Sequence, residues 1–213
     1  GGQKIGVNIN ALDLNKTPLL IQFTGIPMFG TLNGHGQFSF AGNRPVLTGG
    51  DFELTGEKIT IGPKQKLKIE SLPFVEARVP QTNFGDLEMK LSVEKTNRGQ
   101  PTISLDKFRS GGRDLQIQIW GDIELANRLA NADTRLKARL RFHPDFVNSE
   151  KVVKTLLRQE KFRNGKTGDW HGLVFWGRLS KLQWKGSPTA AKGPNSKEKK
   201  GKDQKNGKKP KKK

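Results

Sequence analysis

The residue types that most often carry catalysis or bind metals are scattered along this chain. The histidines His35, His143 and His171 form no His-x-His or His-Glu-x-x-His pattern, so the sequence offers no local pair of metal ligands. No serine lies in a Gly-x-Ser-x-Gly elbow, no Gly-Lys-Ser/Thr phosphate loop occurs, and there is no cysteine. The acidic residues stand singly, and nothing pairs two of them for acid–base work. We therefore expect a non-enzymatic binding protein without a cofactor or a metal.

One short segment nevertheless concentrates positive charge. In residues 134–142, apolar and basic side chains alternate, which puts four cations on one face of a strand: Arg135, Lys137, Arg139 and Arg141. Four like charges on one strand face are unfavourable without counter-charges. The stripe either meets phosphate or carboxylate groups of a partner, or it is a solvated outer face paired with acids such as Asp122 and Glu124 on a neighbouring strand. Both interpretations are consistent with the sequence.

The net charge of +19 lies in the second half of the chain. Residues 1–127 contain fourteen Lys/Arg and thirteen Asp/Glu, residues 128–191 contain fourteen and five, and residues 192–213 contain eleven and two. Such a one-sided field favours anionic partners: nucleic acid, an acidic lipid surface or an acidic protein.

Residues 186–213 are expected to form a disordered, lysine-rich tail, because from Lys192 onward there is no large apolar side chain to bury. Truncation after Ser187 should then leave the melting temperature nearly unchanged. The candidate anion-binding residues of the tail are Lys208, Lys209, Lys211, Lys212 and Lys213. Three interpretations stay open: a solubilising end, an anion-seeking arm and a nuclear localisation signal. Neither the tail nor the stripe offers an aromatic platform, so we expect no sequence-specific binding of nucleic acid.

Alternation with a period of two runs through the whole chain and predicts antiparallel strands. The longest runs are at 86–95, 115–125 and 134–142; shorter candidates lie at 5–9, 19–24, 37–41, 51–55, 58–61, 66–70, 102–105 and 173–179. Turn signals separate them, including Asn33-Gly34, Gly49-Gly50 and Thr55-Gly56. Trp170 and Trp176, in the final strands, are expected to pack in the core or at a sheet edge.

We predict a mainly β protein: a twisted antiparallel sheet, open-barrel or sandwich-like, with one amphipathic helix near the C-terminal end. The helix is expected at 148–162, with a buried stripe of Val152, Val153, Leu156 and Leu157. The inward face of the sheet should carry Leu87, Met89, Leu91, Leu115, Ile117, Ile119, Leu136 and Leu140.

The order of segments in the second half is similar to that of a known family. The strands GDLEMKLSV (85–93), LQIQIWGDIEL (115–125) and TRLKARLRF (134–142) are followed by the helix and by GDWHGLVFWGRL (168–179). This succession resembles the periplasmic part of the type II secretion system protein GspN, in the form found in delta-proteobacteria and spirochaetes. The resemblance covers roughly residues 85–185, and residues 1–84 agree in style only.

The resemblance implies a β-rich periplasmic domain over residues 1–185, held at the inner membrane by an N-terminal anchor that is missing from this sequence. It also implies a non-enzymatic accessory or scaffold role in protein export, with other secretion-apparatus proteins as partners. Anionic lipid or another polyanion is a further expected partner of the basic half. Two other functions remain open: a lipid-handling protein with an apolar β-groove, and a basic nucleic-acid-associated protein.

Overall fold

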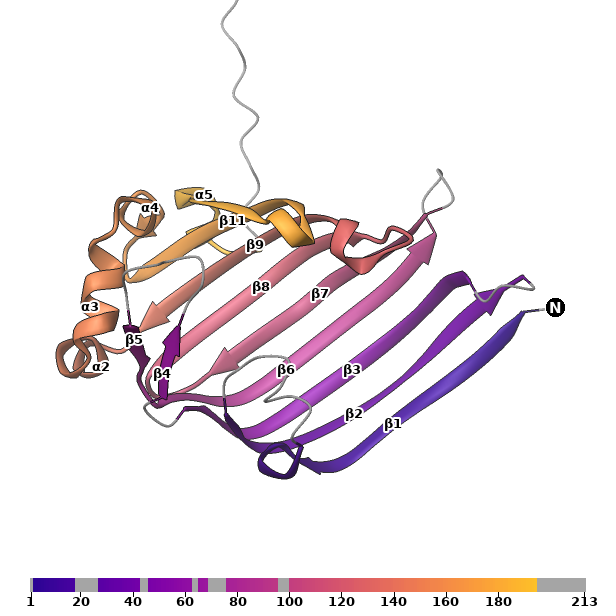
Figure 1. The fold of residues 1–213 in the computed structure, drawn as a ribbon, viewed down its shortest axis with the longest axis horizontal. Helices are drawn as coiled ribbons and strands as arrows, with labels where there is room; N and C mark the ends of the chain where they lie inside the picture. Colours follow the sequence, from indigo (N-terminus) through magenta and orange to yellow (C-terminus); the bar gives the residue numbers. More distant parts are fainter. Residues whose placement is uncertain are drawn as a thin grey trace, which may run out of the picture.

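The computed structural model describes residues 2–17, 27–42, 46–62, 65–68, 76–95 and 100–194, with no side chains described for 65–68 and 76–79. Its main feature is a single antiparallel sheet of ten strands (Figure 1). Along the sheet, the strands run in the order β1 (Gln3–Asp13), β2 (Met28–Ala41), β3 (Val46–Ile61), β6 (Thr82–Lys95), β7 (Pro101–Gly111), β8 (Leu115–Glu124), β9 (Asp133–Phe142), β11 (Trp170–Arg178) and β10 (Lys166–Thr167).

The remaining strands and helices decorate this sheet. β12 (Gln183–Gly186) also pairs with β11, and β4 (Gln65–Lys68) pairs with β5 (Glu76–Val79) in a separate hairpin. The helices are α2 (Pro144–Ser149), α3 (Lys151–Arg158), α4 (Glu160–Arg163) and α5 (Pro188–Ala191), with 3₁₀ turns at Leu14–Lys16, Leu129–Asn131 and Leu179–Lys181. The predicted fold class is therefore confirmed: a mainly β chain whose antiparallel sheet does not close into a barrel. The predicted strand at 19–24 lies outside the described residues.

The register of the strands separates apolar from polar side chains. Met89 lies opposite both Leu54 and Phe108, and Ile117 lies opposite Leu140. All eight residues predicted to point inward are buried or half-buried and share this side of the sheet, the apolar face, with residues such as Phe38, Phe52 and Phe175. The other side, the polar face, carries charged and amide side chains, among them Glu53, Glu88, Lys90, Gln116 and Gln118.

Several glycines predicted to form turns lie instead inside long strands. Gly34 is in β2, and Gly50 and Gly56 are in β3. A Cβ atom on Gly34 would lie only 3.1 Å from the ring of Phe52, and one on Gly50 only 2.7 Å from the ring of Phe38. These positions leave room for two phenylalanine rings, which stack with their centres 6.3 Å apart. The prediction of turns there is wrong because the glycines make space for neighbouring rings.

The buried core lies at the C-terminal end of the sheet. Ala138 of β9, Leu173 of β11 and Phe162 of α4 form its centre, with Leu156 and Leu157 of α3 packed against them. Phe162 also meets the ring of Trp184 edge-on, 5.6 Å between centres. The helical segment therefore covers the apolar face over β9, β11 and β12.

The helical segment predicted near the C-terminal end is confirmed, but its boundaries differ. It begins at Pro144, and extended residues at Glu150 and Gln159 divide it into α2, α3 and α4. Proline suits the first helical position, and α2 buries Phe146 against Phe142 with ring centres 6.5 Å apart. Val152 was expected in the buried stripe; that expectation is wrong, because the side chain is 39% exposed.

Regular structure continues past residue 186, where the sequence predicts that the tail begins. Residue 186 ends β12, and α5 follows, with Ser187 Oγ accepting a hydrogen bond from the amide of Ala190 at 3.3 Å. Ala190 and Ala191 are almost fully buried, and they lie against Gly172 of β11. The predicted boundary at 186 is therefore wrong, because two small side chains pack where a glycine lets the backbone approach. Residues 195–213, with the five tail lysines, lie outside the described residues.

Candidate anion-binding face

The predicted stripe lies on the polar face, at the centre of a wider basic surface. In the register of β9, Arg141 and Arg139 lie opposite Gln116 and Gln118 of β8, and Lys137 lies opposite Trp120. On the other side, Arg135 lies opposite Trp176 of β11. We call this surface the basic face; it comprises Arg135, Lys137, Arg139, Arg141, Trp120, Trp170, Trp176 and Lys185.

Trp170 organises the two arginines at one end of the basic face. The guanidinium carbons of Arg139 and Arg141 lie 4.4 Å and 5.1 Å from the centre of its ring. Each guanidinium also donates to a neutral amide oxygen, Arg139 to Gln118 at 2.9 Å and Arg141 to Gln116 at 2.7 Å. These contacts fix the position of two cations, and none of them cancels their charge.

The electrostatics of this pair favour a bound anion. Burial lowers the pKa of Arg139, and the nearby charge of Arg141 lowers it further. Both effects mean that the charged form of Arg139 is less stable here than in water. An anion placed between the two guanidinium groups would be attracted to both, and this attraction would offset their mutual repulsion.

Trp176 and Lys185 extend the surface toward β12. The ammonium of Lys185 lies 5.6 Å from the centre of the Trp176 ring, and Trp176 is 37% exposed. Trp170 and Trp176 lie in β11, beside the edge strands β10 and β12, and both rings contact cations on the polar face, which the prediction of core or edge packing did not include. The aromatic neighbours of the stripe, Trp120, Trp170 and Trp176, come from β8 and β11.

The counter-charges expected for the stripe have other contacts. Arg135 pairs with Asp133 of its own strand at 3.3 Å, yet its side chain stays 74% exposed. Asp122 lies opposite Arg135 in the register, but its Oδ1 accepts a hydrogen bond from Ser104 at 2.7 Å. Glu124 lies opposite Asp133 rather than opposite a cation of the stripe.

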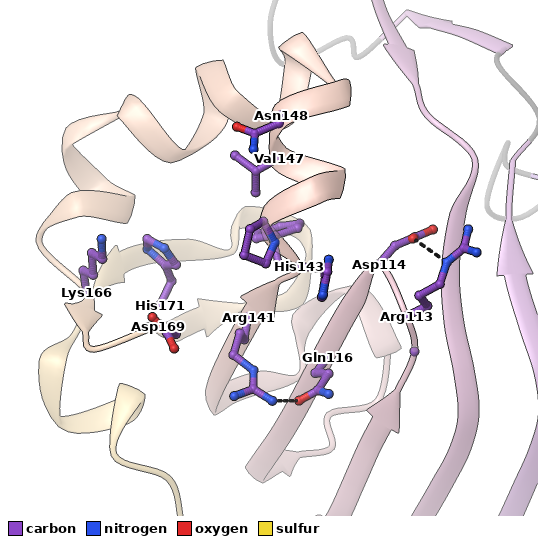
Figure 2. Close-up of a pocket in the computed structure, with 13 residues that line it drawn as sticks. Arg113, Asp114, Gln116, Arg141, His143, Val147, Asn148, Lys166, Asp169 and His171 are labelled. Atoms are coloured by element: carbon purple, nitrogen blue, oxygen red, sulfur yellow. Dashed lines mark hydrogen bonds and ion pairs between the residues drawn. The ribbon is translucent and has the colours of Figure 1, made fainter.

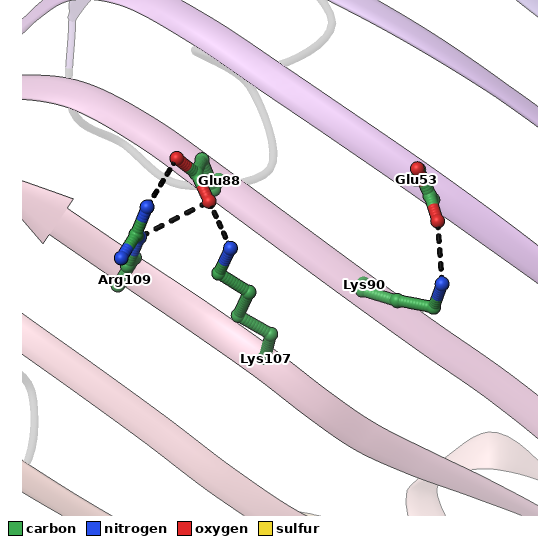
Figure 3. A network of polar contacts seen from close by, with 5 residues as sticks. All are labelled: Glu53, Glu88, Lys90, Lys107 and Arg109. Carbon is green, nitrogen blue, oxygen red and sulfur yellow. Dashed lines mark hydrogen bonds and ion pairs between the residues drawn. The ribbon is translucent and has the colours of Figure 1, made fainter.

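The cations of the preceding strands provide a contrast on the same polar face (Figure 3). Lys90 Nζ lies 2.6 Å from Glu53 Oε1, and Glu88 holds both Arg109, at 2.6 Å, and Lys107. Hydrogen bonds from Arg109 and then Lys107 lower the pKa of Glu88 to about 2. The polar face is thus divided: acids neutralise the cations of β6 and β7, whereas neutral amides hold Arg139 and Arg141 of β9.

A hollow of about 440 Å³ adjoins the basic face where β9 ends (Figure 2). Gln116 and Arg141 line one side of it, and His143, Lys166 and His171 line others. Burial, and then the charge of Lys166, lower the pKa of His171, although a hydrogen bond to the carbonyl of Phe162 opposes the shift. His171 is therefore neutral near pH 7, and its Nδ1–H donates to that carbonyl at 3.2 Å.

Sequence reasoning did not single out Trp120, Lys185 or the two glutamines as parts of this surface. The sequence does contain a signal for the residues of β8, because Gln116, Gln118 and Trp120 alternate with Leu115, Ile117 and Ile119. Read as a strand facing 134–142, that alternation places them beside the stripe.

In the described part of the chain, no three His, Asp or Glu side chains come together closely enough to hold a metal ion. No helix in the described residues has the length and apolarity needed to cross a membrane. Comparison of the chain with protein-family models, with curated proteins and with solved structures finds no match.

Proposed function

We propose that this protein is a non-enzymatic accessory or scaffold component of a bacterial type II secretion apparatus, acting in the periplasm at the inner membrane. The basic face binds an acidic surface of another protein of the apparatus.

The basic face is the observation that carries this proposal. Arg139 and Arg141 are held in fixed positions by Trp170 and by two neutral glutamines, so the surface is ordered before a partner arrives. Ordered cations lose less conformational freedom on binding than free lysines do, which favours specific association with carboxylates. The resemblance to GspN over residues 85–185 supports the choice of apparatus, and strands β6, β8, β9 and β11 cover its segments.

Affinity capture in the producing bacterium tests this function. The tagged chain is cross-linked in cells, and its partners are quantified by mass spectrometry. Enrichment of secretion-apparatus proteins is expected. Changing Arg135, Lys137, Arg139 and Arg141 to Gln should reduce that enrichment at least tenfold.

A matched control removes the same charge elsewhere. Lys151, Lys154, Arg158 and Arg163 are exposed residues of α3 and α4, and their change to Gln should leave the partners bound. Equal loss in both variants would mean that only net charge matters. Capture without any apparatus protein would contradict the proposed role.

Lipid handling is a second candidate function, favoured by a different observation. Beyond the reach of α3 and α4, large side chains of the apolar face are only half-buried within the described structure: Phe38, Phe52, Leu54, Met89, Leu91 and Phe108. Acyl chains would remove such a surface from water. Native mass spectrometry after detergent-free purification separates the two functions, because a stoichiometric lipid adduct is expected for lipid handling alone.

A further inference from the structure

The two edges of the sheet differ in how they are protected. At one edge, β11 is covered by the short strands β10 and β12, and α4 and α5 pack beside them. At the other edge lies β1, which within the described residues pairs with β2 alone (Figure 1). The outer side of such an edge strand presents a row of backbone N–H and C=O groups to which a second strand can bind.

β1 lacks most of the features that block such pairing. It is eleven residues long and contains no proline and one lysine, Lys4. Ile5, Val7 and Ile9 lie on its apolar side, opposite Phe38, Gly36 and Gly34 of β2. The side chain of Ile5 is 49% exposed, so the apolar face is left open at this edge. Natural edge strands are usually protected by inward charges, lysines, prolines or bulges. In β1 the one break in register falls after Ile9.

The sequence of β1 is complementary to itself. In an antiparallel pair of two β1 strands centred on Val7, Ile5 of each copy lies opposite Ile9 of the other. Lys4 then lies opposite Asn10, so the centre of the pair brings no like charges together. A twofold axis perpendicular to the sheet keeps the apolar faces of both copies on the same side.

The charge distribution allows two copies to meet at this edge. Residues 1–127 are almost neutral, with fourteen basic and thirteen acidic side chains. β9, which carries the stripe, is six strand positions from β1. At about 4.8 Å per strand this is roughly 29 Å, well beyond the screening length of about 8 Å at physiological salt.

We propose that two copies of this chain pair edge to edge through β1, antiparallel and about a twofold axis near Val7. The pair forms one continuous sheet with an unbroken apolar face, and its two basic faces lie at the outer ends. This inference does not depend on the secretion role or on the identity of an anionic partner.

Analytical ultracentrifugation of the purified chain at micromolar concentrations tests the pairing. We expect a dimer whose dissociation constant rises at least tenfold in the variant I5K/I9K and in the variant I5E/I9E. A one-to-one mixture of these two variants should form a heterodimer, because each Lys then faces a Glu across the axis. Circular dichroism melting shows whether each variant is folded.

The control variant is L129K, which places a lysine at a side chain that is 63% exposed and far from β1 in the strand order. It should dimerise like the original chain. A monomeric original chain at 100 micromolar, or a dimer that I5K/I9K leaves intact, would overturn the proposal. In a monomeric sample, protection from hydrogen exchange of those β1 amides that point away from β2 would equally overturn it, since another part of the same chain would then cover the edge.

Discussion

The guanidinium carbon of Arg139 lies 4.4 Å from the centre of the Trp170 ring, across the junction of β9 and β11. Arg141 contacts the same ring from 5.1 Å. One indole therefore orders two cations that would otherwise repel each other. The order of the basic face at this end depends on this contact.

Replacing Trp170 with alanine should remove that order. We expect the free energy of unfolding to fall by roughly 1–3 kcal/mol, because a half-buried ring and two cation–π contacts are lost together. Urea unfolding followed by circular dichroism measures the change. The variant Trp170→Phe keeps an aromatic ring and should lose less than half as much. Unchanged stability in Trp170→Ala would show that the contact does not hold the arginines.

Truncation at two positions tests the docking of α5. A chain ending at Pro194 should melt at the original temperature. One ending at Ser187 loses Ala190 and Ala191, which are 1% and 2% exposed. We expect this second chain to lose about 2 kcal/mol and to melt about 4–8 °C lower. Equal melting of the two chains would mean that α5 contributes no stability, as the composition alone suggested.

The pair of cations on Glu88 predicts a dependence of stability on acid. Its pKa is lowered from 4.5 to about 2, mainly by hydrogen bonds from Arg109 and Lys107. A depressed folded-state pKa adds stability that is complete above pH 4.5 and is lost as the pH falls through about 2. The difference in unfolding free energy between the original chain and Glu88→Gln should therefore shrink across this range. Because the Glu88 carboxylate is accessible to water, we expect this change in the unfolding free energy to be small. A difference between the two chains that stays constant with pH would contradict the ion pairs.

Period-two alternation predicted which residues of a strand share a face, although the predicted turns divided the long strands β2 and β3 at their glycines. Leu87, Leu115 and Leu136 are on the apolar face, and Arg135 and Arg139 are on the opposite face, as the alternation requires. The contact between Arg139 and Trp170 could not be predicted in this way. It depends on which strand pairs with β9 and in which register, and the helical segment separates those strands in sequence.

Predictions from local composition were wrong where small residues make the tertiary contacts. Ala190 and Ala191 resemble linker residues until Gly172 is placed beneath them. Gly34 and Gly50 resemble turn residues until the rings of Phe52 and Phe38 are placed beside them. In each case, the partner is distant in sequence, so the pattern around the residue carries no trace of it.

The most direct test of the claim that the basic face binds anionic groups uses vesicles of phosphatidylcholine and phosphatidylglycerol as the probe and measures how the chain ending at Pro194 binds them at low salt. We expect measurable binding that fades steeply by physiological salt, because screened charges supply the attraction. Changing Arg135, Lys137, Arg139 and Arg141 to Gln should weaken it at least tenfold, whereas the matched change of Lys151, Lys154, Arg158 and Arg163 should not. Specific and scrambled DNA should compete equally well for the same surface. Equal binding by the two variants would show that the basic face is only a solvated surface. Nanomolar, sequence-dependent binding of DNA at physiological salt would contradict the proposed role and indicate a nucleic-acid-binding protein instead.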